Sequence, residues 1–173
     1  MPAPPGSGKS TLCAALVSRG WRLLSDELTM VRLSDGLIEP LPRPISLKNA
    51  SIEVIRGYAP HCVFSRSVAD TNKGTVAHVK APAESVARAA EAVRAAWIVF
   101  PRYQAGAAPL LETIPQGRAM IEVAQNAFNY SLLAGRGFEA MARLIEGSTS
   151  FRFCYSALDD AIATFARLAP PLK

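Results

Sequence analysis

The sequence predicts an α/β fold with a mixed sheet, and three features of the chain support this expectation. A glycine-rich loop, Gly6-Ser7-Gly8, is followed directly by an apolar segment of helical length, Lys9–Arg19. Short apolar runs of strand length, such as Trp21–Leu24 and Ala95–Phe100, alternate with longer segments of helical pattern. The pair Asp35-Gly36 lies between two further apolar runs and is typical of a hairpin turn. Alternating strands and helices predict a layered α/β fold, to which the hairpin adds antiparallel pairing.

The elements of the first third follow from local patterns. The helix Lys9–Arg19 is expected to end at Gly20, because glycine commonly terminates helices. The run Trp21–Leu24 is a predicted buried strand with two acidic residues at its tip. Residues 28–38 form a predicted hairpin, and three prolines then separate it from a short predicted strand, Ile45–Leu47.

The middle of the chain continues the alternation. Asn49 is a candidate N-cap for a helix that extends to Tyr58. Residues 75–80 alternate as a strand does, and residues 83–94 have a helical pattern. We expect Pro101 to end the strand Ala95–Phe100, because proline has no N–H for a sheet ladder.

The last third is predicted to contain strands and helices in turn. Ser156, with Asp159 three residues later, resembles a capping box in front of the last helix. The expected elements are a strand Leu110–Ile114, helices Gln116–Phe128 and Phe138–Ile145, a strand Phe151–Tyr155 and a helix Ala157–Leu168.

Length and composition limit the class of protein. The chain has 173 residues, so we expect a single domain over residues 1–173. No apolar run approaches the roughly 20 residues that a membrane helix needs, and residues 1–5 have no signal-peptide pattern. We therefore expect a cytoplasmic protein that does not bind membranes.

Charge and cysteine content argue against two further classes. The net charge is +5, but the basic residues are dispersed along the chain, so nucleic-acid binding is not indicated. The three cysteines, Cys13, Cys62 and Cys154, are an odd number without metal-ligand spacing. This pattern favours free thiols over disulfides or structural zinc.

A short segment near the start of the chain has the most specific chemical pattern. The phosphate-binding loop is written G-x-x-x-x-G-K-[ST]. Gly8, Lys9 and Ser10 match it, and Ala3 stands at the place of its first glycine. A loop of this composition before an apolar helix predicts a nucleotide-binding site, although a glycine-rich turn before a helix is the plainer alternative.

The expected ligands of this loop are ATP and Mg²⁺. Small residues allow successive backbone N–H groups to surround a phosphate. Lys9 is placed to reach the β- and γ-phosphates and Ser10 to bind Mg²⁺, while the helix N-terminus favours the anion. The predicted nucleotide-binding residues are Gly6, Ser7, Gly8, Lys9, Ser10 and Thr11.

Two consecutive acids, Asp26 and Glu27, follow the predicted strand. Enzymes with a phosphate-binding loop use an acid at the end of a neighbouring strand to hold the metal directly or through water. Together with Ser10, these acids are candidate Mg²⁺ ligands. The alternative is that Asp26 merely caps a turn.

A longer pattern connects the loop to the acids. It comprises Gly6-x-Gly8-Lys9-Ser10, a helix, Arg19-Gly20-x-Arg22-Leu23, a small residue and the two acids, with no gap in spacing. This pattern resembles the catalytic domain of the HPr kinase/phosphorylase family. Two later segments, Arg43–Asn49 and Val99–Tyr103, are similar to the HPr kinase-related group A proteins.

The resemblance implies a P-loop nucleotide-binding fold of the HPr kinase and PEP carboxykinase type. It also implies that Asp26 is the base for a serine hydroxyl and that Glu27, in the place of a family aspartate, binds metal. A protein or peptide phosphoacceptor and homo-oligomers are implied by the same likeness. Since only Met1 and Pro2 precede the loop, we expect the family's central strand to be missing and the chain to be truncated at its N-terminus.

Other candidates and functions stay open. Arg102 follows a predicted strand and is a further candidate catalytic residue, because strand ends gather around the ligand in α/β sheets. Arg43 and Lys48 are candidates for contact with phosphate or with a partner protein. The preferred function is an ATP-dependent serine kinase. The alternatives are a small-metabolite kinase and a non-catalytic nucleotide-binding regulatory module.

Overall fold

The computed structural model describes residues 1–168, which separate into two compact units. The first unit comprises residues 1–8, residues 31–38 and the chain from Ala92 onward; the second comprises residues 9–30 and 39–91. We predicted one domain over residues 1–173, of which residues 169–173 lie outside the described part.

The elements alternate between helices and strands, as the sequence pattern predicts. None of the helices within residues 1–168 has the length and apolar character that a membrane span requires. The elements are α1 (Lys9–Ser18), β1 (Met30–Val31), β2 (Ile38–Glu39), β3 (Ile45–Lys48), α2 (Ala50–Tyr58), β4 (Val68–Thr71), β5 (Gly74–Val79), α3 (Ala83–Ala87), β6 (Trp97–Tyr103), β7 (Leu110–Thr113), α4 (Gln116–Gln125), α5 (Tyr130–Glu146), β8 (Thr149–Tyr155) and α6 (Leu158–Arg167).

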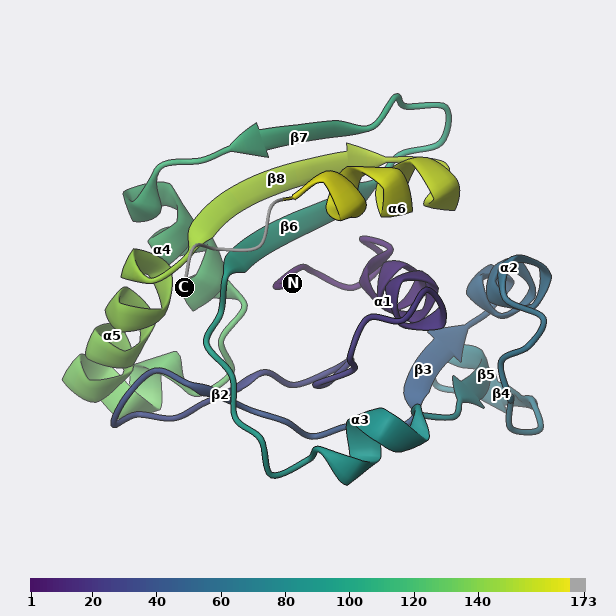
Figure 1. The fold of residues 1–173 in the computed structure, drawn as a ribbon, viewed down its shortest axis with the longest axis horizontal. Helices are drawn as coiled ribbons and strands as arrows, with labels where there is room; N and C mark the ends of the chain where they lie inside the picture. The colour runs from purple at the N-terminus through teal and green to yellow at the C-terminus, as the bar shows by residue number, and fades with distance from the viewer. Residues whose placement is uncertain (169–173) are drawn as a thin grey trace. The chain divides into compact units, whose positions relative to one another are not determined.

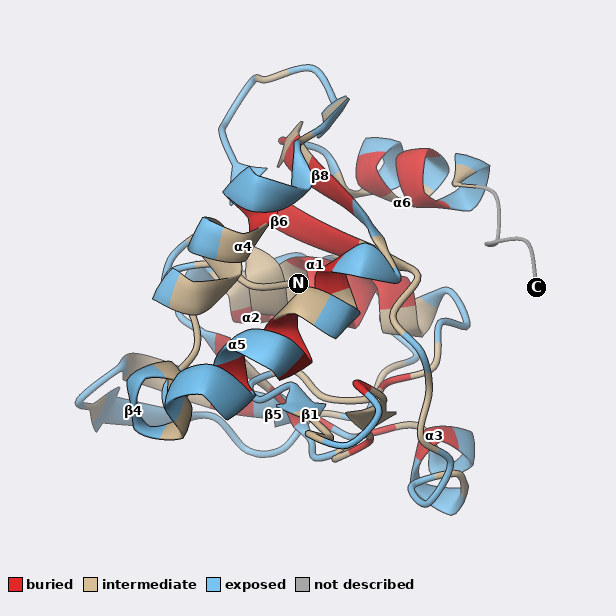
Figure 2. Ribbon diagram, turned by 90° about the vertical axis from the view of Figure 1, so that its left-hand side faces the viewer, coloured by how far each residue is buried: buried red, intermediate tan, exposed pale blue. Residues whose placement is uncertain are grey.

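The first unit is built on a three-stranded mixed sheet in the order β6-β8-β7 (Figure 1). β6 and β8 run parallel, and β7 pairs antiparallel with β8. A parallel pair needs a long crossover connection, which β7, α4 and α5 provide here. Figure 2 shows the buried residues that run along β6 and β8.

Helices pack on both faces of this sheet. On one face, Ile98 and Phe100 of β6 form a buried cluster with residues of α4 and α5, among them Met141. On the other face, Phe153 of β8 meets Phe165 of α6 edge-on, with ring centroids 5.4 Å apart. Alternation along the strands therefore directs apolar side chains into two layers of core.

The second unit contains an antiparallel sheet in the order β3-β5-β4. Ile45 and Leu47 of β3 are fully buried, and their register partners Val79 and Ala77 of β5 are buried beside them. α1 and α2 pack against β3 and against one another. The opposite face of the sheet carries the intervening side chains, which are half-buried or exposed.

The predicted strand Trp21–Leu24 is wrong, because this segment has no strand partner in the described structure. Its apolar character reflects burial: Leu23 is only 2 % exposed. The Leu23 N–H donates to the hydroxyl of Ser85 at 3.0 Å, and the Leu24 carbonyl accepts the N–H of Leu41 at 2.7 Å. The segment therefore makes single hydrogen bonds to Ser85 and Leu41 instead of the regular strand pairing that we predicted.

Two predicted element ends are also wrong. β6 continues through Pro101 to Tyr103, because parallel pairing with β8 extends to the register pair Tyr103 and Tyr155. β6 pairs with β8 alone in the described sheet, and proline is tolerated in such an edge strand. The predicted helix over residues 83–94 ends at Ala87. Beyond it, Arg22 donates to the carbonyl oxygens of Arg88 and Glu91 at 2.6 and 2.9 Å.

Both predicted caps are wrong. Asn49 precedes α2, but its side chain accepts the N–H of Thr75 at 3.0 Å instead of capping the helix. The Ser156 hydroxyl donates to the carbonyl of Ala107 at 2.8 Å, and α6 has no side-chain cap. The predicted helix Phe138–Ile145 is too short, because α5 begins at Tyr130. The remaining helices and strands occur near their predicted places, and β4 is an additional strand that the sequence pattern did not indicate.

Candidate functional site

The glycine-rich loop adopts the backbone that its composition predicts. Gly6 and Gly8 have φ angles of +83° and +86°, a region that favours glycine. The Ser7 N–H donates to the carbonyl of Pro4 at 3.4 Å, which closes a turn immediately before the helix. α1 begins at Lys9, so the turn leads directly into a helix N-terminus, the element that attracts phosphate groups.

Two aromatic residues of the first unit hold this turn. The Tyr103 N–H donates to the Ser7 carbonyl at 2.9 Å, and the Tyr155 hydroxyl donates to the Gly8 carbonyl at 3.0 Å. Burial raises the pKa of Tyr155 to about 12, so its phenol stays a donor at neutral pH. A side chain on Gly8 would place Cβ 2.6 Å from the Tyr155 hydroxyl and 2.9 Å from Tyr103 Cβ. The turn is therefore fixed by β6 and β8.

The hydroxyl of Ser7 is buried and has no hydrogen-bond partner among the described residues. A buried hydroxyl without a partner destabilises the folded state, since it has lost its hydrogen bonds to water. An anion in the turn could accept this hydrogen bond. Ser7 thus fits the predicted role of the loop.

In the second unit, Lys9, Ser10 and Thr11 form the first turn of α1, and all three are half-buried. Asp26 lies beside this turn. Its Oδ2 atom accepts the N–H of Ser46 on β3 at 3.2 Å. Its Oδ1 atom is buried without a hydrogen-bond partner of ordinary geometry. One oxygen of Asp26 therefore orients the carboxylate, and the other remains available.

The surroundings of Asp26 perturb its ionisation. Burial raises the pKa of the carboxyl above its usual value, and the neighbouring Glu27 adds to this effect. The Ser10 hydroxyl, the Ser46 N–H and the Lys9 ammonium oppose the shift without cancelling it. An aspartate with a raised pKa is a stronger base once ionised, which is the property that proton abstraction requires.

Asp26 and Glu27 border a groove of about 1080 Å³ within the second unit. Its floor is the exposed face of the β3-β5-β4 sheet, where Ser46, Val76 and His78 contribute side chains. Among the other predicted contact residues, Arg43 lines this groove, whereas Lys48 lies outside its lining. The groove gives a ligand access to both acids.

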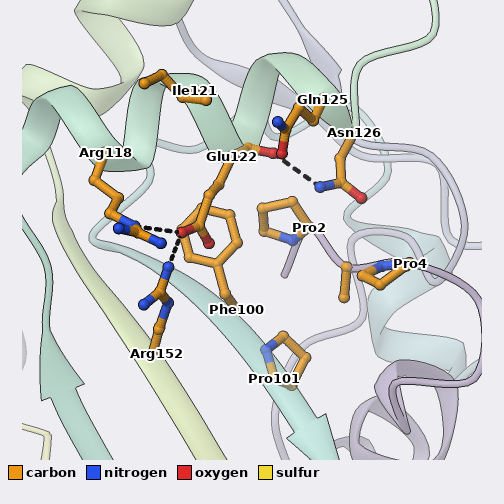
Figure 3. A pocket seen from close by; sticks show the side chains of 11 residues that line it. Pro2, Pro4, Phe100, Pro101, Arg118, Ile121, Glu122, Gln125, Asn126 and Arg152 are labelled. Carbon is orange, nitrogen blue, oxygen red and sulfur yellow. Dashed lines mark hydrogen bonds and ion pairs between the residues drawn. The ribbon is translucent and has the colours of Figure 1, made fainter.

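The second cavity, of about 510 Å³, lies in the first unit between residues 2–4, β6 and α4 (Figure 3). Its polar side is an ion-pair cluster in which Glu122 binds Arg118 at 3.1 Å and also binds Arg152. None of the predicted catalytic, nucleotide or metal residues lines it. This cavity therefore has no part in the chemistry predicted from the sequence.

No known protein family, curated protein or solved structure matches the chain. The resemblance drawn from the sequence therefore stays a hypothesis. The residues of the site and their geometry decide which chemistry it can perform.

The oxygen groups beside α1 suit a magnesium ion. Asp26 Oδ1 has unused lone pairs, and the Ser10 hydroxyl and the exposed Glu27 carboxylate belong to the same unit. Mg²⁺ prefers oxygen ligands, and it commonly uses one or two carboxylates together with water and phosphate. Within residues 1–168, no cluster of three or more His, Cys, Asp or Glu side chains forms a dedicated metal cage.

Arg102 is the last of the predicted site residues, and Cys13 is a further ionisable group near Asp26. Arg102 lies near the end of β6 in the first unit, where its side chain is exposed and its register partner is Cys154. Burial, with a smaller contribution from Asp26, raises the pKa of the Cys13 thiol to about 12. Cys13 is therefore protonated at neutral pH and is not a nucleophile.

The contacts that Ser46, Tyr103 and Tyr155 make at the site were not predicted from the sequence. Tyr103 and Tyr155 end two strands that proved to be parallel neighbours, and ligand-binding residues gather at such ends. Their position at strand ends was the available indication. Ser46 binds Asp26 through its backbone N–H, and a side-chain pattern cannot indicate such a contact.

Proposed function

We propose that this protein is an ATP-dependent kinase that transfers the γ-phosphate to a hydroxyl group, with serine of a small protein or peptide as the acceptor. The observation that carries the proposal is the half-buried carboxylate of Asp26, whose Oδ1 atom is buried. It is oriented by Ser46, has an unpartnered oxygen and lies beside Lys9 and Ser10 at the start of α1. An ionisable group whose charged form is disfavoured by its surroundings is a candidate for a catalytic role.

Nucleotide binding is supported by the turn before α1. The positive φ angles of Gly6 and Gly8, the unpartnered Ser7 hydroxyl and the helix N-terminus are each suited to phosphate. Gly8 and Lys9 are bonded neighbours, so the turn and the helix adjoin through the chain itself. Lys9 supplies the positive charge that the β- and γ-phosphates need.

The proposed step transfers one phosphoryl group and one proton. The acceptor oxygen forms a bond to the γ-phosphorus while the bond from that phosphorus to the β,γ-bridging oxygen breaks. ADP leaves with the bonding electron pair, and Asp26 Oδ1 takes the proton of the acceptor hydroxyl. The proton then passes to water, which restores the carboxylate for the next cycle.

Mg²⁺, when bound, supplies neutralisation of the charge that develops on the transferring phosphate. Ser10 and Glu27 would hold it directly and Asp26 would hold it through water, so that Asp26 Oδ1 can still take the proton. Glu27 is exposed at the groove, and its longer side chain reaches further than an aspartate does. Because the reaction consumes ATP, we place it in the cytoplasm.

A labelling experiment tests the proposal. The 173-residue protein is incubated with γ-labelled ATP, Mg²⁺ and a degenerate peptide library with a central serine, beside a matched library with alanine. We expect label in the serine library alone, and no label with the Lys9→Ala variant. Binding of MgATP without label in either library, or label only in a panel of small metabolites, would contradict a protein kinase and favour one of the two alternatives.

A further inference from the structure

The groove beside Asp26 contains positive charge that the proposed phosphotransfer does not use. Arg43, Arg66 and Lys73 all line it. None of the three has an ion-pair partner among the described residues, whereas Arg22, Arg56 and Arg88 of the same unit each pair with a glutamate. Two arginines and one lysine therefore line the same groove as Asp26 and Glu27 without forming an ion pair with either acid.

The sheet register indicates how far Arg66 lies from Asp26. The Ser46 N–H binds Asp26, and Ser46 is the register partner of His78 on β5. The His78 carbonyl accepts the N–H of Ser65, and the His78 N–H donates to the Ser65 hydroxyl. Each step across a sheet covers about 5 Å, so Ser65 and the adjoining Arg66 begin about 10 Å from Ser46.

This spacing corresponds to a short length of extended chain. An extended peptide advances about 3.3 Å per residue, so about 10 Å equals about three residues. Lys73 lies in the turn between β4 and β5, where its N–H donates to the Thr71 hydroxyl at 3.1 Å. Leu28, Leu41 and Val76 add apolar surface to the lining of the same groove.

We propose that this groove binds the phosphoacceptor as an extended acidic peptide segment, with a carboxylate side chain about three residues from the phosphorylated hydroxyl. The inference rests on the proposed kinase function, whose substrate it narrows. Charge complementarity selects the occupant, because the unpaired basic side chains that line the groove favour a segment that carries a carboxylate. An acidic segment satisfies Arg66 while its hydroxyl reaches Asp26, and Lys73 adds positive charge to the same groove.

Peptide binding without nucleotide tests the inference directly. The probes are labelled heptapeptides with a central serine and either glutamate or glutamine at the third position on each side. Fluorescence anisotropy should show the glutamate peptide binding about tenfold more tightly, with the difference shrinking at high salt. The double variant Arg66→Gln/Lys73→Gln should lose most of this preference, and Lys80→Gln, an exposed lysine outside the groove, should retain it.

A charge-reversed variant distinguishes a change in peptide preference from a loss of binding caused by misfolding. Arg66→Glu/Lys73→Glu should bind a peptide with lysine at the same positions and reject the glutamate peptide. In the phosphotransfer assay, the glutamine double variant should raise KM for the acidic peptide about tenfold without changing kcat or the MgATP affinity.

The outcomes separate the inference from the proposed function. Equal binding of the two peptides, an unchanged preference in the double variant, or a loss of MgATP affinity in that variant overturns the inference. Selective binding of the acidic peptide without any phosphotransfer counts against the kinase function alone, and it supports the groove as an acidic-peptide site.

Discussion

The hydroxyl of Tyr155 donates a hydrogen bond of 3.0 Å to the carbonyl oxygen of Gly8. Tyr155 is 1 % exposed, and its ring stacks on Phe153 at a centroid distance of 5.3 Å. The last residue of a core strand thus holds the residue that immediately precedes α1. The rigidity of the core is transmitted to the loop through this contact.

Removing that hydroxyl should loosen the loop. We expect Tyr155→Phe to weaken MgATP binding about fivefold, because one net hydrogen bond is worth about 1 kcal/mol. Calorimetry measures the affinity. Tyr103→Phe is the matched control, since the Tyr103 hydroxyl has no hydrogen bond among the described residues. Equal affinities in the two variants would show that the Tyr155 contact does not position the loop.

Substitution of Gly8 should be more severe. Gly8→Ala meets both a positive φ angle and contacts of 2.6 and 2.9 Å to the two tyrosines. The conformational strain alone costs about 1–3 kcal/mol, which corresponds to a few degrees in Tm for a chain of this size. Gly57→Ala is the control, because Gly57 lies in α2 with open space around it. A Gly8→Ala protein with unchanged Tm and MgATP affinity would contradict the described turn.

The two acids should differ in their effects on catalysis. Asp26→Asn keeps the side-chain size and removes the proton acceptor, so phosphotransfer should fall about 10²–10⁴-fold while MgATP still binds. Glu27→Gln should instead raise the Mg²⁺ concentration needed for half-maximal rate, and Glu27→Asp should be tolerated. Titration of Mg²⁺ against rate distinguishes them. Nearly full rate in Asp26→Asn, with only a changed metal requirement, would refute its role as base.

Asp26 should also lower stability at neutral pH. Its pKa is raised in the folded chain, so the ionised form is disfavoured by folding. The stability that Asp26 contributes is complete below the ordinary value of 3.8 and is lost as pH rises through the folded value. We therefore expect Asp26→Asn to have a higher Tm than the parent at pH 7, and expect the difference to vanish in acid. Thermal melts across this range measure it.

Asp35 provides a control of opposite sign. The Leu37 N–H, with help from Arg32, lowers the pKa of Asp35, so its contribution is present above 3.8 and lost in acid. Asp35→Asn should lower Tm slightly at pH 7, and this effect should shrink as the pH falls below 3.8. If both variants shift Tm in the same direction at pH 7, local ionisation does not explain the result.

The glycine-rich turn, the helix after it and the alternating strands could be predicted from the sequence. Each depends on neighbours in the chain: Gly6 and Gly8 allow a left-handed backbone, and alternation along Ile45–Lys48 separates a buried face from an open one. Local conformational preference and the burial of one face act over a few residues. Such features are therefore visible before any tertiary structure is known.

Hydrogen bonds between residues far apart in the chain could be found only from the tertiary structure. Leu23 is as apolar as a strand residue, yet its N–H binds the Ser85 side chain, and the Asn49 side chain binds Thr75 rather than its own helix. The pairing of Tyr155 with Gly8 spans 147 residues of sequence. The residue types and their spacing already indicate which side chains are chemically able to bind phosphate and accept a proton. The packing of the chain sets which oxygen of Asp26 is left unpartnered and which cations line the same groove. Neither can be predicted from sequence, because hydrogen bonding and desolvation depend on residues that meet only in the folded chain.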